Sequence, residues 1–415
     1  MSKNINEIEL MAPVGSLESL TAAIEGGANA VYFGMGRLNM RSRSSINFSP
    51  DEVKEIVKIC HDNNVKAYLT LNVVVYDNEI EEIKKIINYA SEIGLDAIIA
   101  SDISVIKYAN EKNIEVHIST QVNISNLEAV KFYAKFADVI VLARELNLEQ
   151  IKYISEKIKE ENICGPSGNL IKLELFIHGA LCMSISGKCY LSLHNHNYSA
   201  NRGECLQDCR RAYIVIDKEN KFELEIDNEY IMSPKDLCTI HFINKIIEAG
   251  IKIFKIEGRA RSPEYVYIVT KCYREAIESY FNGTYSQEKI EYWRKELSKV
   301  FNRGFWDGYY LGQKLGEWSH IYGSNATMLK IYAAKCTNYY KNIGVAEFLC
   351  EASEINRGEK ALIIGPTTGV KEIILNNIVV ENVYVDKVKK GEKFTMSLPF
   401  VIRRSDKLFR WVFKS

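Results

Sequence analysis

The chain has 415 residues, of which 47% are hydrophobic and 26% are charged, a composition typical of a soluble globular protein of two or three domains. Lys+Arg and Asp+Glu both number 53, so the net charge gives no sign of a globally basic nucleic-acid binder, although a local basic face stays possible. The N-terminus lacks an apolar signal core and no apolar run approaches about 18 residues, which predicts a cytoplasmic protein without a membrane partner. Because that compartment is reducing, clustered members of the ten cysteines indicate metal binding or catalysis rather than disulfides.

The first part of the chain alternates short β-branched runs with amphipathic helical stretches. Alternation of this kind predicts a parallel sheet, and eight repeats match a TIM-like (β/α)8 barrel, with a doubly wound open sheet as the alternative. One helix is predicted to start at Ser49-Pro50, with Ser49 as N-cap. The eight predicted strands are 8–12, 30–34, 66–73, 97–100, 115–118, 139–142, 173–177 and 252–256.

Three further segments follow from the pattern. Residues 178–238 interrupt the barrel repeat after the seventh strand, as an irregular, cysteine-bearing insertion within a predicted barrel domain of residues 1–262. Such an insertion at the C-terminal end of a strand lies where barrels carry their chemistry. Residues 263–324 are predicted to form a helical connector, and residues 325–415, with short alternating strands and turn signals, a small C-terminal β-barrel module.

Four cysteines belong to the insertion and its end: Cys182, Cys189, Cys205 and Cys238, spaced 7, 16 and 33 residues apart. Thiolates bind iron–sulfur clusters and zinc, and paired zinc knuckles are missing apart from Cys205-x3-Cys209. The spacing alone therefore leaves a cluster, zinc or free thiols open. It also leaves open whether Cys209 takes the place of Cys205.

A wider pattern surrounds these cysteines. The stretch ELFIHGALCMSISGKCYLS, from Glu174 to Ser192, is similar to the signature of the collagenase-like peptidase family (peptidases of unknown type, family 32). NRGECLQDCRRAY, MSPKDLC, FKIEGRARSPEYV and NRGFWDGYY follow in the family's order, and the opening LMAPVGSLESLTAAIEGGANAVYFG resembles its first βαβ unit. The resemblance covers nearly the whole chain.

This resemblance implies more than the family's name. Similar proteins hydroxylate nucleic acids or quinone precursors without molecular oxygen, which implies that Cys182, Cys189, Cys205 and Cys238 bind a [4Fe-4S] cluster. For several members it also implies prephenate as the oxygen source. The length and β module resemble the branch that converts the tRNA wobble uridine to 5-hydroxyuridine, so tRNA or other RNA and a protein partner of the same family are the expected partners. A true peptidase, with Cys182 and His178 as a nucleophile pair, and a zinc- or cluster-stabilised RNA- or protein-binding scaffold are the alternatives.

A dicarboxylate such as prephenate calls for arginine forks at the strand ends. Candidate substrate-binding residues are Arg144, Arg259, Arg41 and Arg43, each of which could instead pair with a neighbouring carboxylate, as Arg144 with Glu145. Candidate proton-transfer groups are His178, Glu145 and Glu257, with His178 alternatively a hydrogen-bond donor near Cys182. The polar ends of the third and fifth strands, Asn72 and residues 119–123, either line the pocket or cap helices.

The C-terminal run VIRRSDKLFRWVFKS, from Val401, interleaves basic and aromatic residues. Basic side chains hold phosphates and aromatic ones stack on unpaired bases, so this strand is a candidate RNA contact. Alternating aromatics on a last strand also pack a small barrel, and this second interpretation is the commoner one.

Overall fold

The computed structural model describes residues 4–43, 47–214, 232–313 and 316–414. Residues 215–231 of the predicted insertion and 44–46 beside Arg43 lie outside the described residues. In the part that is described, no helix is both long and apolar enough to cross a membrane.

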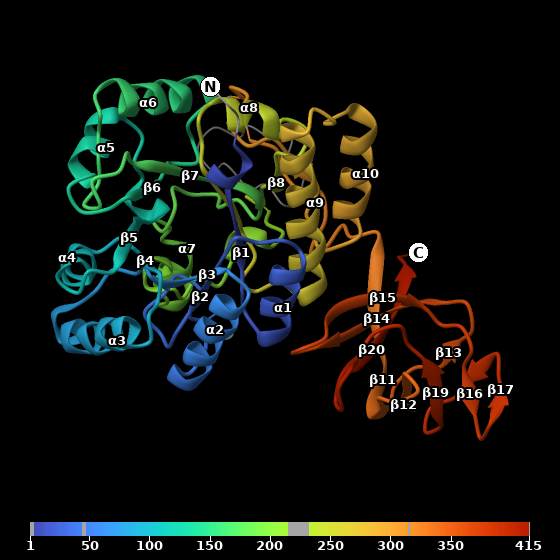
Figure 1. The fold of residues 1–415 in the computed structure, drawn as a ribbon. Helices are drawn as coiled ribbons and strands as arrows, with labels where there is room; N and C mark the ends of the chain where they lie inside the picture. The colour runs from blue at the N-terminus through green and yellow to red at the C-terminus, as the bar shows by residue number, and fades with distance from the viewer. Residues whose placement is uncertain (1–3, 44–46, 215–231, 314–315, 415) are drawn as a thin grey trace.

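Eight parallel strands close into a barrel, as the sequence predicts (Figure 1). Each strand pairs with the next along the chain from β1 to β7, and β9 closes the ring by pairing with both β7 and β1. The strands are short and nearly continuous runs of buried residues, as in β4 with four buried residues, because both faces of a parallel barrel sheet are covered. Their bounds are β1 Glu9–Pro13, β2 Ala30–Gly34, β3 Lys66–Leu71, β4 Ala97–Ala100, β5 Glu115–Ile118, β6 Val139–Val141, β7 Lys172–Gly179 and β9 Ile253–Ile256.

Five of the eight described helices of the outer ring begin at a side-chain cap. Ser49 and Glu52 form a reciprocal capping box on α2, whose first residue is Pro50, and Asn147 and Gln150 do the same for α6. The ring consists of α1 Leu17–Glu25, α2 Pro50–Asp62, α3 Ile80–Glu92, α4 Ile103–Glu111, α5 Leu127–Tyr133, α6 Leu148–Glu160, α8 Ile243–Glu248 and α9 Pro263–Phe281. Because α9 follows the last barrel strand and packs on α1 and β1, it occupies the place of the barrel's final helix. The predicted domain boundaries stay predictions.

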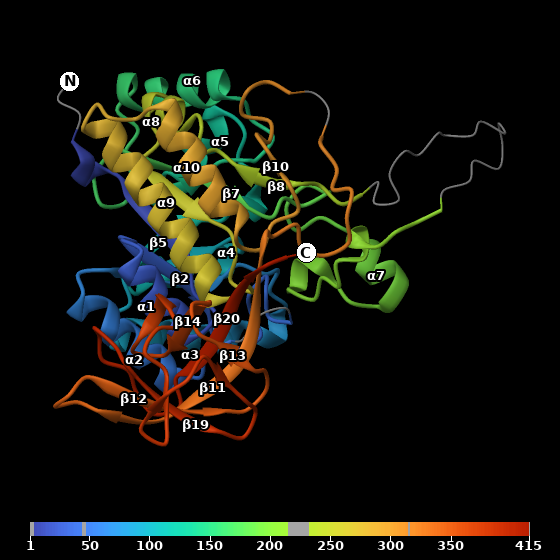
Figure 2. The ribbon, with the colours of Figure 1, turned by 90° about the vertical axis from the view of Figure 1, so that its right-hand side faces the viewer.

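The insertion leaves the barrel after β7 and projects from it with the short helix α7, Leu191–His196 (Figure 2). It returns through β8, Asp236–Cys238, which pairs antiparallel with the end of β7 and parallel with β10, Phe305–Trp306. The helix α8 starts at Ile243, after β8 has ended at Cys238. The pairing of β8 places Cys238 opposite His178.

The C-terminal segment is an antiparallel β module joined to the barrel through α10, Gln287–Ser298. Its eight-stranded sheet has the order β15-β14-β20-β11-β12-β19-β16-β17, and β13 pairs with β18 beside it. Figure 1 shows this module next to α1 and α9. The strands are β11 Met328–Tyr340, β12 Val345–Cys350, β13 Ile355–Asn356, β14 Lys360–Gly365, β15 Gly369–Ile374, β16 Val379–Val380, β17 Val383–Tyr384, β18 Lys387–Val388, β19 Lys393–Ser397 and β20 Lys407–Phe413.

The predicted RNA-contacting run falls on β20. Leu408 packs in the module's own core, Trp411 is buried against the barrel, and Arg410 forms an ion pair with Glu359 at 2.7 Å. Phe413 is 79% exposed at the strand's end. The structure thus favours packing for most of this strand and leaves one aromatic ring at the surface.

Candidate active site

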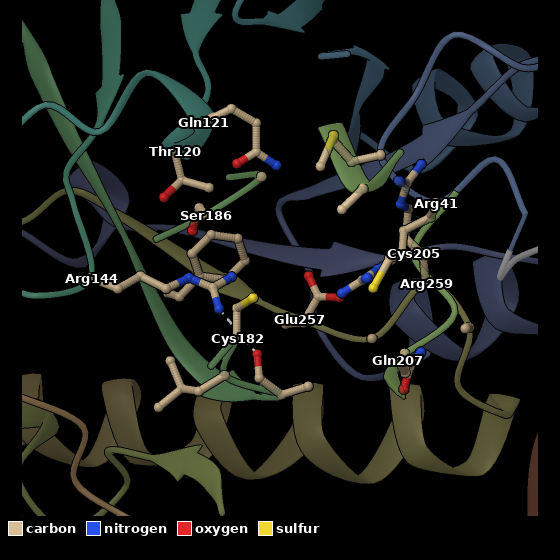
Figure 3. Close-up of a pocket in the computed structure, with 18 of the residues that line it drawn as sticks. Arg41, Thr120, Gln121, Arg144, Cys182, Ser186, Cys205, Gln207, Glu257 and Arg259 are labelled. Carbon is tan, nitrogen blue, oxygen red and sulfur yellow. Dashed lines mark hydrogen bonds and ion pairs between the residues drawn. The ribbon is translucent and has the colours of Figure 1, made fainter. Parts of the chain in front are cut away.

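A cavity of about 200 Å³ opens at the C-terminal ends of the barrel strands and is covered by the insertion. The predicted residues Arg41, Arg144, Arg259 and Glu257 line it, together with the polar end of β5 and Asn72. Figure 3 shows these arginines, Glu257, Thr120 and Gln121 around one space. Thr120 Oγ1 and Gln121 Oε1 are buried without a hydrogen-bond partner in the described structure, so both present free polar atoms at the cavity.

The cavity lining is strongly cationic. Its basic residues are Arg41, Arg144, Arg210, Lys255, Arg259, Arg261 and Arg303, while Glu257 is the single carboxylate among its described lining residues. Three of these cations pair with carboxylates: Arg41 with Glu257 at 2.7 Å, Lys255 with Glu174 at 2.7 Å and Arg303 with Asp236 at 3.3 Å. The excess of positive charge among these lining residues favours an anionic ligand.

Arg259 is the most deeply buried of the described arginines that line the cavity. It is 5% exposed, donates from Nη1 to Thr70 Oγ1 at 2.8 Å, and has no carboxylate within 4.0 Å in the described chain. Gly34 lets it lie there, since a Cβ at that position would sit 2.7 Å from Arg259 Nη1. Burial lowers the pKa of Arg259 to about 10, so the guanidinium stays charged at neutral pH and lacks a full counter-charge.

Arg144 approaches the cavity from the end of β6. Its guanidinium stacks over Phe176 at 4.0 Å from the ring centroid and donates to the carbonyl of Ala180 at 3.1 Å. Its Nε is buried without a partner among the described residues, and no ion pair with Glu145 forms there. Arg144 therefore remains available to a ligand.

Glu257 lies between the arginines. Arg41 donates to its Oε1 from Nε at 3.2 Å and from Nη2 at 2.7 Å. Burial favours the neutral carboxyl, but Arg41, Arg144 and Arg259 outweigh it and lower the pKa of Glu257 to about 2. Glu257 is therefore an anion that orders the arginines and is a poor proton donor at neutral pH.

The other predicted residues lie elsewhere. Arg43 stacks on Tyr198 at 3.9 Å outside the cavity lining, and exposed Glu145 borders a separate hollow of about 40 Å³. His178 is 1% exposed and lies among aromatic rings, with Nδ1 at 3.3 Å from Tyr273 Oη. Burial lowers the pKa of His178 to about 3, so its ring is neutral. His178 is covered because β8 and Tyr273 of α9 lie against the end of β7. The roles expected of the three residues stay predictions.

The structure also regroups the cysteines. Cys182, Cys189 and Cys205 line the cavity, and Cys209 lines it with them. Burial is the main reason that the pKa of Cys209 rises to about 11, and the three neighbouring thiols raise it further. Cys238, in contrast, is 2% exposed outside that lining and contacts Tyr273 Oη at 3.9 Å. Cys209, and not Cys238, thus lines the cavity with the other three thiols, while the ligand role expected of Cys238 stays a prediction.

The four thiols at the cavity match the soft donor set that iron–sulfur clusters and zinc require. Among the described residues, no three cysteine, histidine or carboxylate side chains are already arranged around a metal position. The four thiols and their shared cavity therefore fit a thiolate-bound group. The cysteine side chains would have to move closer together to bind it. The cluster and its ligands stay predictions.

Lys255 and Arg210 are among the lining residues that were not predicted from the sequence. Lys255 lies in β9, the eighth barrel strand. A charged residue inside a run of buried apolar residues was the signal that could have indicated it. Arg210 binds the carbonyls of Leu181 and Pro234 at 2.5 and 2.6 Å and so ties the two ends of the insertion together.

Comparisons with known proteins decide the family. The model of peptidase family U32 matches residues 15–320. The chain belongs to peptidase family U32. A protein named collagenase from Porphyromonas gingivalis is 56% identical over 408 residues, 98% of this chain and 99% of that protein. An uncharacterized protease of Methanocaldococcus jannaschii is 40% identical over 97% of this chain and 98% of its own length. A tRNA hydroxylation protein of Bacillus subtilis is 36% identical over 71% of this chain and 69% of its own length.

These findings confirm the family and the TIM-like barrel that the sequence predicts. They place the chain among relatives that carry two kinds of name, protease and RNA hydroxylation protein. The specific activity has to be argued from the site.

Proposed function

We propose that this U32 protein hydroxylates a nucleic-acid base without molecular oxygen, with the tRNA wobble uridine as substrate and a prephenate-like dicarboxylate as co-substrate. The observation that carries the proposal is the pair Arg144 and Arg259. Both are guanidinium groups at one cavity, without carboxylate partners in the described structure, beside a group of thiols. A small molecule with two carboxylates supplies the missing counter-charges.

Arg259 and Arg144 would each receive a carboxylate, since a guanidinium presents paired N–H donors that match carboxylate oxygens. Glu257 holds Arg41 in place and repels a misplaced carboxylate. The unpartnered oxygens of Thr120 and Gln121 lie on the β5 side, where they can accept hydrogen bonds from a hydroxyl group. These residues bind and orient the small molecule; none of them needs to titrate.

The thiols Cys182, Cys189 and Cys205, with Cys209 as the fourth, would hold a [4Fe-4S] cluster at the cavity mouth. When bound, such a cluster supplies electron transfer to or from the reacting molecules. The insertion that carries the thiols covers the cavity, so this chain's own contribution is to keep the small molecule next to the ligating side chains and away from bulk water. A base must be unstacked to reach such a site.

A second candidate is peptide hydrolysis, because the relative that shares 56% identity over almost the whole chain is named collagenase. The expected nucleophile pair does not assemble in the described structure: Cys182 lines the cavity, whereas buried His178 faces Tyr273. Peptide hydrolysis would therefore need another base, and the cationic cavity suits a peptide carboxylate rather than a peptide backbone.

One set of preparations separates the two candidates. We expect protein purified without oxygen to contain about four iron and four sulfide per chain, and we expect Cys182→Ser, but not the buried control Cys60→Ser, to lose them. Nucleoside mass spectrometry of tRNA from a deletion strain should show 5-hydroxyuridine derivatives depleted and restored by the wild-type gene. Iron-free protein that cleaves denatured collagen, together with unchanged tRNA, would instead establish the peptidase.

A further inference from the structure

The active-site cavity carries more positive charge than one dicarboxylate neutralises. Of its seven described basic lining residues, three have a carboxylate within 4.0 Å and four have none in the described chain. Two of these four, Arg144 and Arg259, are the proposed partners of the dicarboxylate (Figure 3). The other two are Arg210 and Arg261.

Arg210 has a counter-charge close by. It directly follows Cys209, and its charge opposes the burial that raises the pKa of that thiol. Thiolates that bind a metal are negatively charged, so the ligating side chains would balance Arg210. Arg261 is then the cation of the cavity that still lacks a counter-charge among the described residues.

The guanidinium of Arg261 is held flat against an aromatic ring. Its central carbon lies 3.5 Å from the centre of the Phe301 ring, which is the distance of a stacked cation–π contact. A stacked guanidinium directs its N–H groups outward along its edge. No described residue accepts a hydrogen bond from these groups, and Arg261 lines the cavity. The donors of Arg261 are therefore available to a ligand there.

Arg303 lies beside Arg261 at the same ring. Its guanidinium carbon is 5.0 Å from the centre of Phe301, and its Nη1 is 3.3 Å from Oδ1 of Asp236, a residue that is 2% exposed. Asp236 holds one edge of Arg303, which leaves the other N–H groups of Arg303 for a ligand. We call Arg261 and Arg303 the Phe301 arginine pair. With Asp236, the pair has one positive charge in excess.

This charge and these donors match a phosphodiester. A phosphodiester carries one negative charge and has two free oxygens, and each guanidinium can donate to them with paired N–H groups. A purely structural role explains the pair poorly, because two like charges at one ring repel each other and Asp236 balances only one of them.

We propose that the Phe301 arginine pair binds a backbone phosphate of the nucleic-acid substrate, next to the base that enters the cavity. The inference rests on the proposed function in taking a nucleic acid as the substrate. Phosphate contacts fix the position of a nucleic acid without reading its sequence. The cavity would then hold two anions at separate places, the phosphate at the Phe301 arginine pair and the dicarboxylate at Arg144 and Arg259. No bond is made or broken at the phosphate.

A pair of matched ligands tests the phosphate contact. The first is the RNA trinucleotide UpUpU, and the second has the same bases joined by uncharged methylphosphonate links. In titration calorimetry with the full chain, we expect the wild type to bind UpUpU at least tenfold more tightly than the uncharged analogue. Arg261→Met keeps the apolar contact with Phe301 and should bind the two ligands alike. Arg357→Met, at an exposed arginine of the β module, should keep the wild-type preference.

Two further measurements complete the design. Malonate, a small dicarboxylate, should bind Arg261→Met as it binds the wild type, which shows that the variant is folded and that the two anions occupy separate places. Arg261→Gln, which also removes the charge, replaces Arg261→Met if that variant does not fold. Inorganic phosphate should bind the wild type at least tenfold more weakly than UpUpU.

Several results would overturn the proposal. Equal binding of the two trinucleotides by the wild type, or an unchanged preference in Arg261→Met, would show that no phosphate contacts Arg261. Displacement of UpUpU by malonate would show one shared anion site, and inorganic phosphate binding as tightly as UpUpU would show a site for the free ion. The proposed function is tested separately. An Arg261-dependent preference with unchanged tRNA in a deletion strain would keep the phosphate site and remove the tRNA substrate.

Discussion

At the scale of single residues, the cavity holds charges that are costly to bury and that a bound anion would stabilise. Arg259 shows this most clearly, because it is 5% exposed and its side chain has a threonine hydroxyl, rather than a carboxylate, as its hydrogen-bond partner in the described chain. Its contribution to folding and its contribution to binding should therefore have opposite signs.

Replacing Arg259 by Met tests that opposition. We expect malonate to bind at least tenfold more weakly, because a charged hydrogen bond contributes about 1.5–3 kcal/mol, while the melting temperature stays equal or rises. Titration calorimetry and thermal unfolding measure the two effects. The control Arg43→Met, outside the cavity, should leave malonate binding unchanged. A variant that binds normally, or that loses binding only because it unfolds, would contradict this role for Arg259.

His117 makes the stability of the fold depend on pH. It is buried between two carboxylates, with Nε2 3.2 Å from Glu115 Oε1 and Nδ1 3.4 Å from Glu174 Oε2. Its pKa is about 9 in the folded protein against an ordinary value of 6.5, so its charge stabilises the fold fully below about pH 6.5 and that stabilisation disappears as the pH rises through 9. Urea unfolding should show wild type more stable than His117→Gln at pH 6, by up to about 3 kcal/mol, with the difference shrinking by pH 9.5. A constant difference across this range would mean that His117 is neutral.

At the scale of elements, β8 decides what the insertion can do. Tyr273 on α9 donates to the carbonyl of Ile177 on β7 at 2.9 Å and accepts from the backbone N–H of Thr239, just after β8, at 2.9 Å. One hydroxyl group therefore fastens the antiparallel pair that returns the chain from the insertion to the barrel. It also lies beside Cys238, which explains why that thiol faces α9 rather than the cavity.

Tyr273→Phe should therefore loosen the return of the insertion. Removing the hydroxyl takes away its hydrogen bonds to the Ile177 carbonyl and the Thr239 N–H, which stay bonded to each other at 3.2 Å, so the cost is about 0.5–1.5 kcal/mol. The free energy of unfolding should fall by that amount, and Cys238 should react faster with a thiol reagent. Tyr292→Phe on the exposed side of α10 is the matched control and should change neither quantity. Unchanged Cys238 reactivity in Tyr273→Phe would show that β8 is held by the sheet alone.

The strand β8 also separates what could be predicted from the sequence from what could not. The barrel strands follow from local patterns, such as the buried run in β4 and the Ser49 cap before α2, so the barrel could be predicted. Arg144 and Arg259 could be found because they directly follow strands. Cys238 could not be placed, because a three-residue antiparallel strand has no periodicity and the direction of its side chains depends on its partner β7. The ion pair of Lys255 with Glu174 was not predicted because the two residues lie on strands far apart in the chain.

At the scale of the whole molecule, the barrel and the β module share a hydrophobic core. Trp411 on β20 and Met328 on β11 are buried in the same cluster as Tyr265 and Tyr273 of α9. Lys330 of the module pairs with Glu264 of α9 at 2.7 Å, and Lys371 of β15 pairs with Glu25 of α1 at 2.6 Å. A second cluster, around the stacked rings of Phe348 and Phe394, belongs to the module alone. The molecule should therefore unfold as one cooperative unit, because the two parts bury apolar surface against each other.

Trp411→Ala and Phe348→Ala separate these two cores. Each removes a large buried ring and should cost about 3–5 kcal/mol. In differential scanning calorimetry Trp411→Ala should split the single transition of the wild type into two, because it removes contact between module and barrel and leaves each part's own core intact. Phe348→Ala should lower the transition temperature without weakening the surface that binds the barrel. The module and the barrel should therefore still unfold in one transition. A single transition in Trp411→Ala would mean that the ion pairs to Glu264 and Glu25, rather than the shared core, join the two parts.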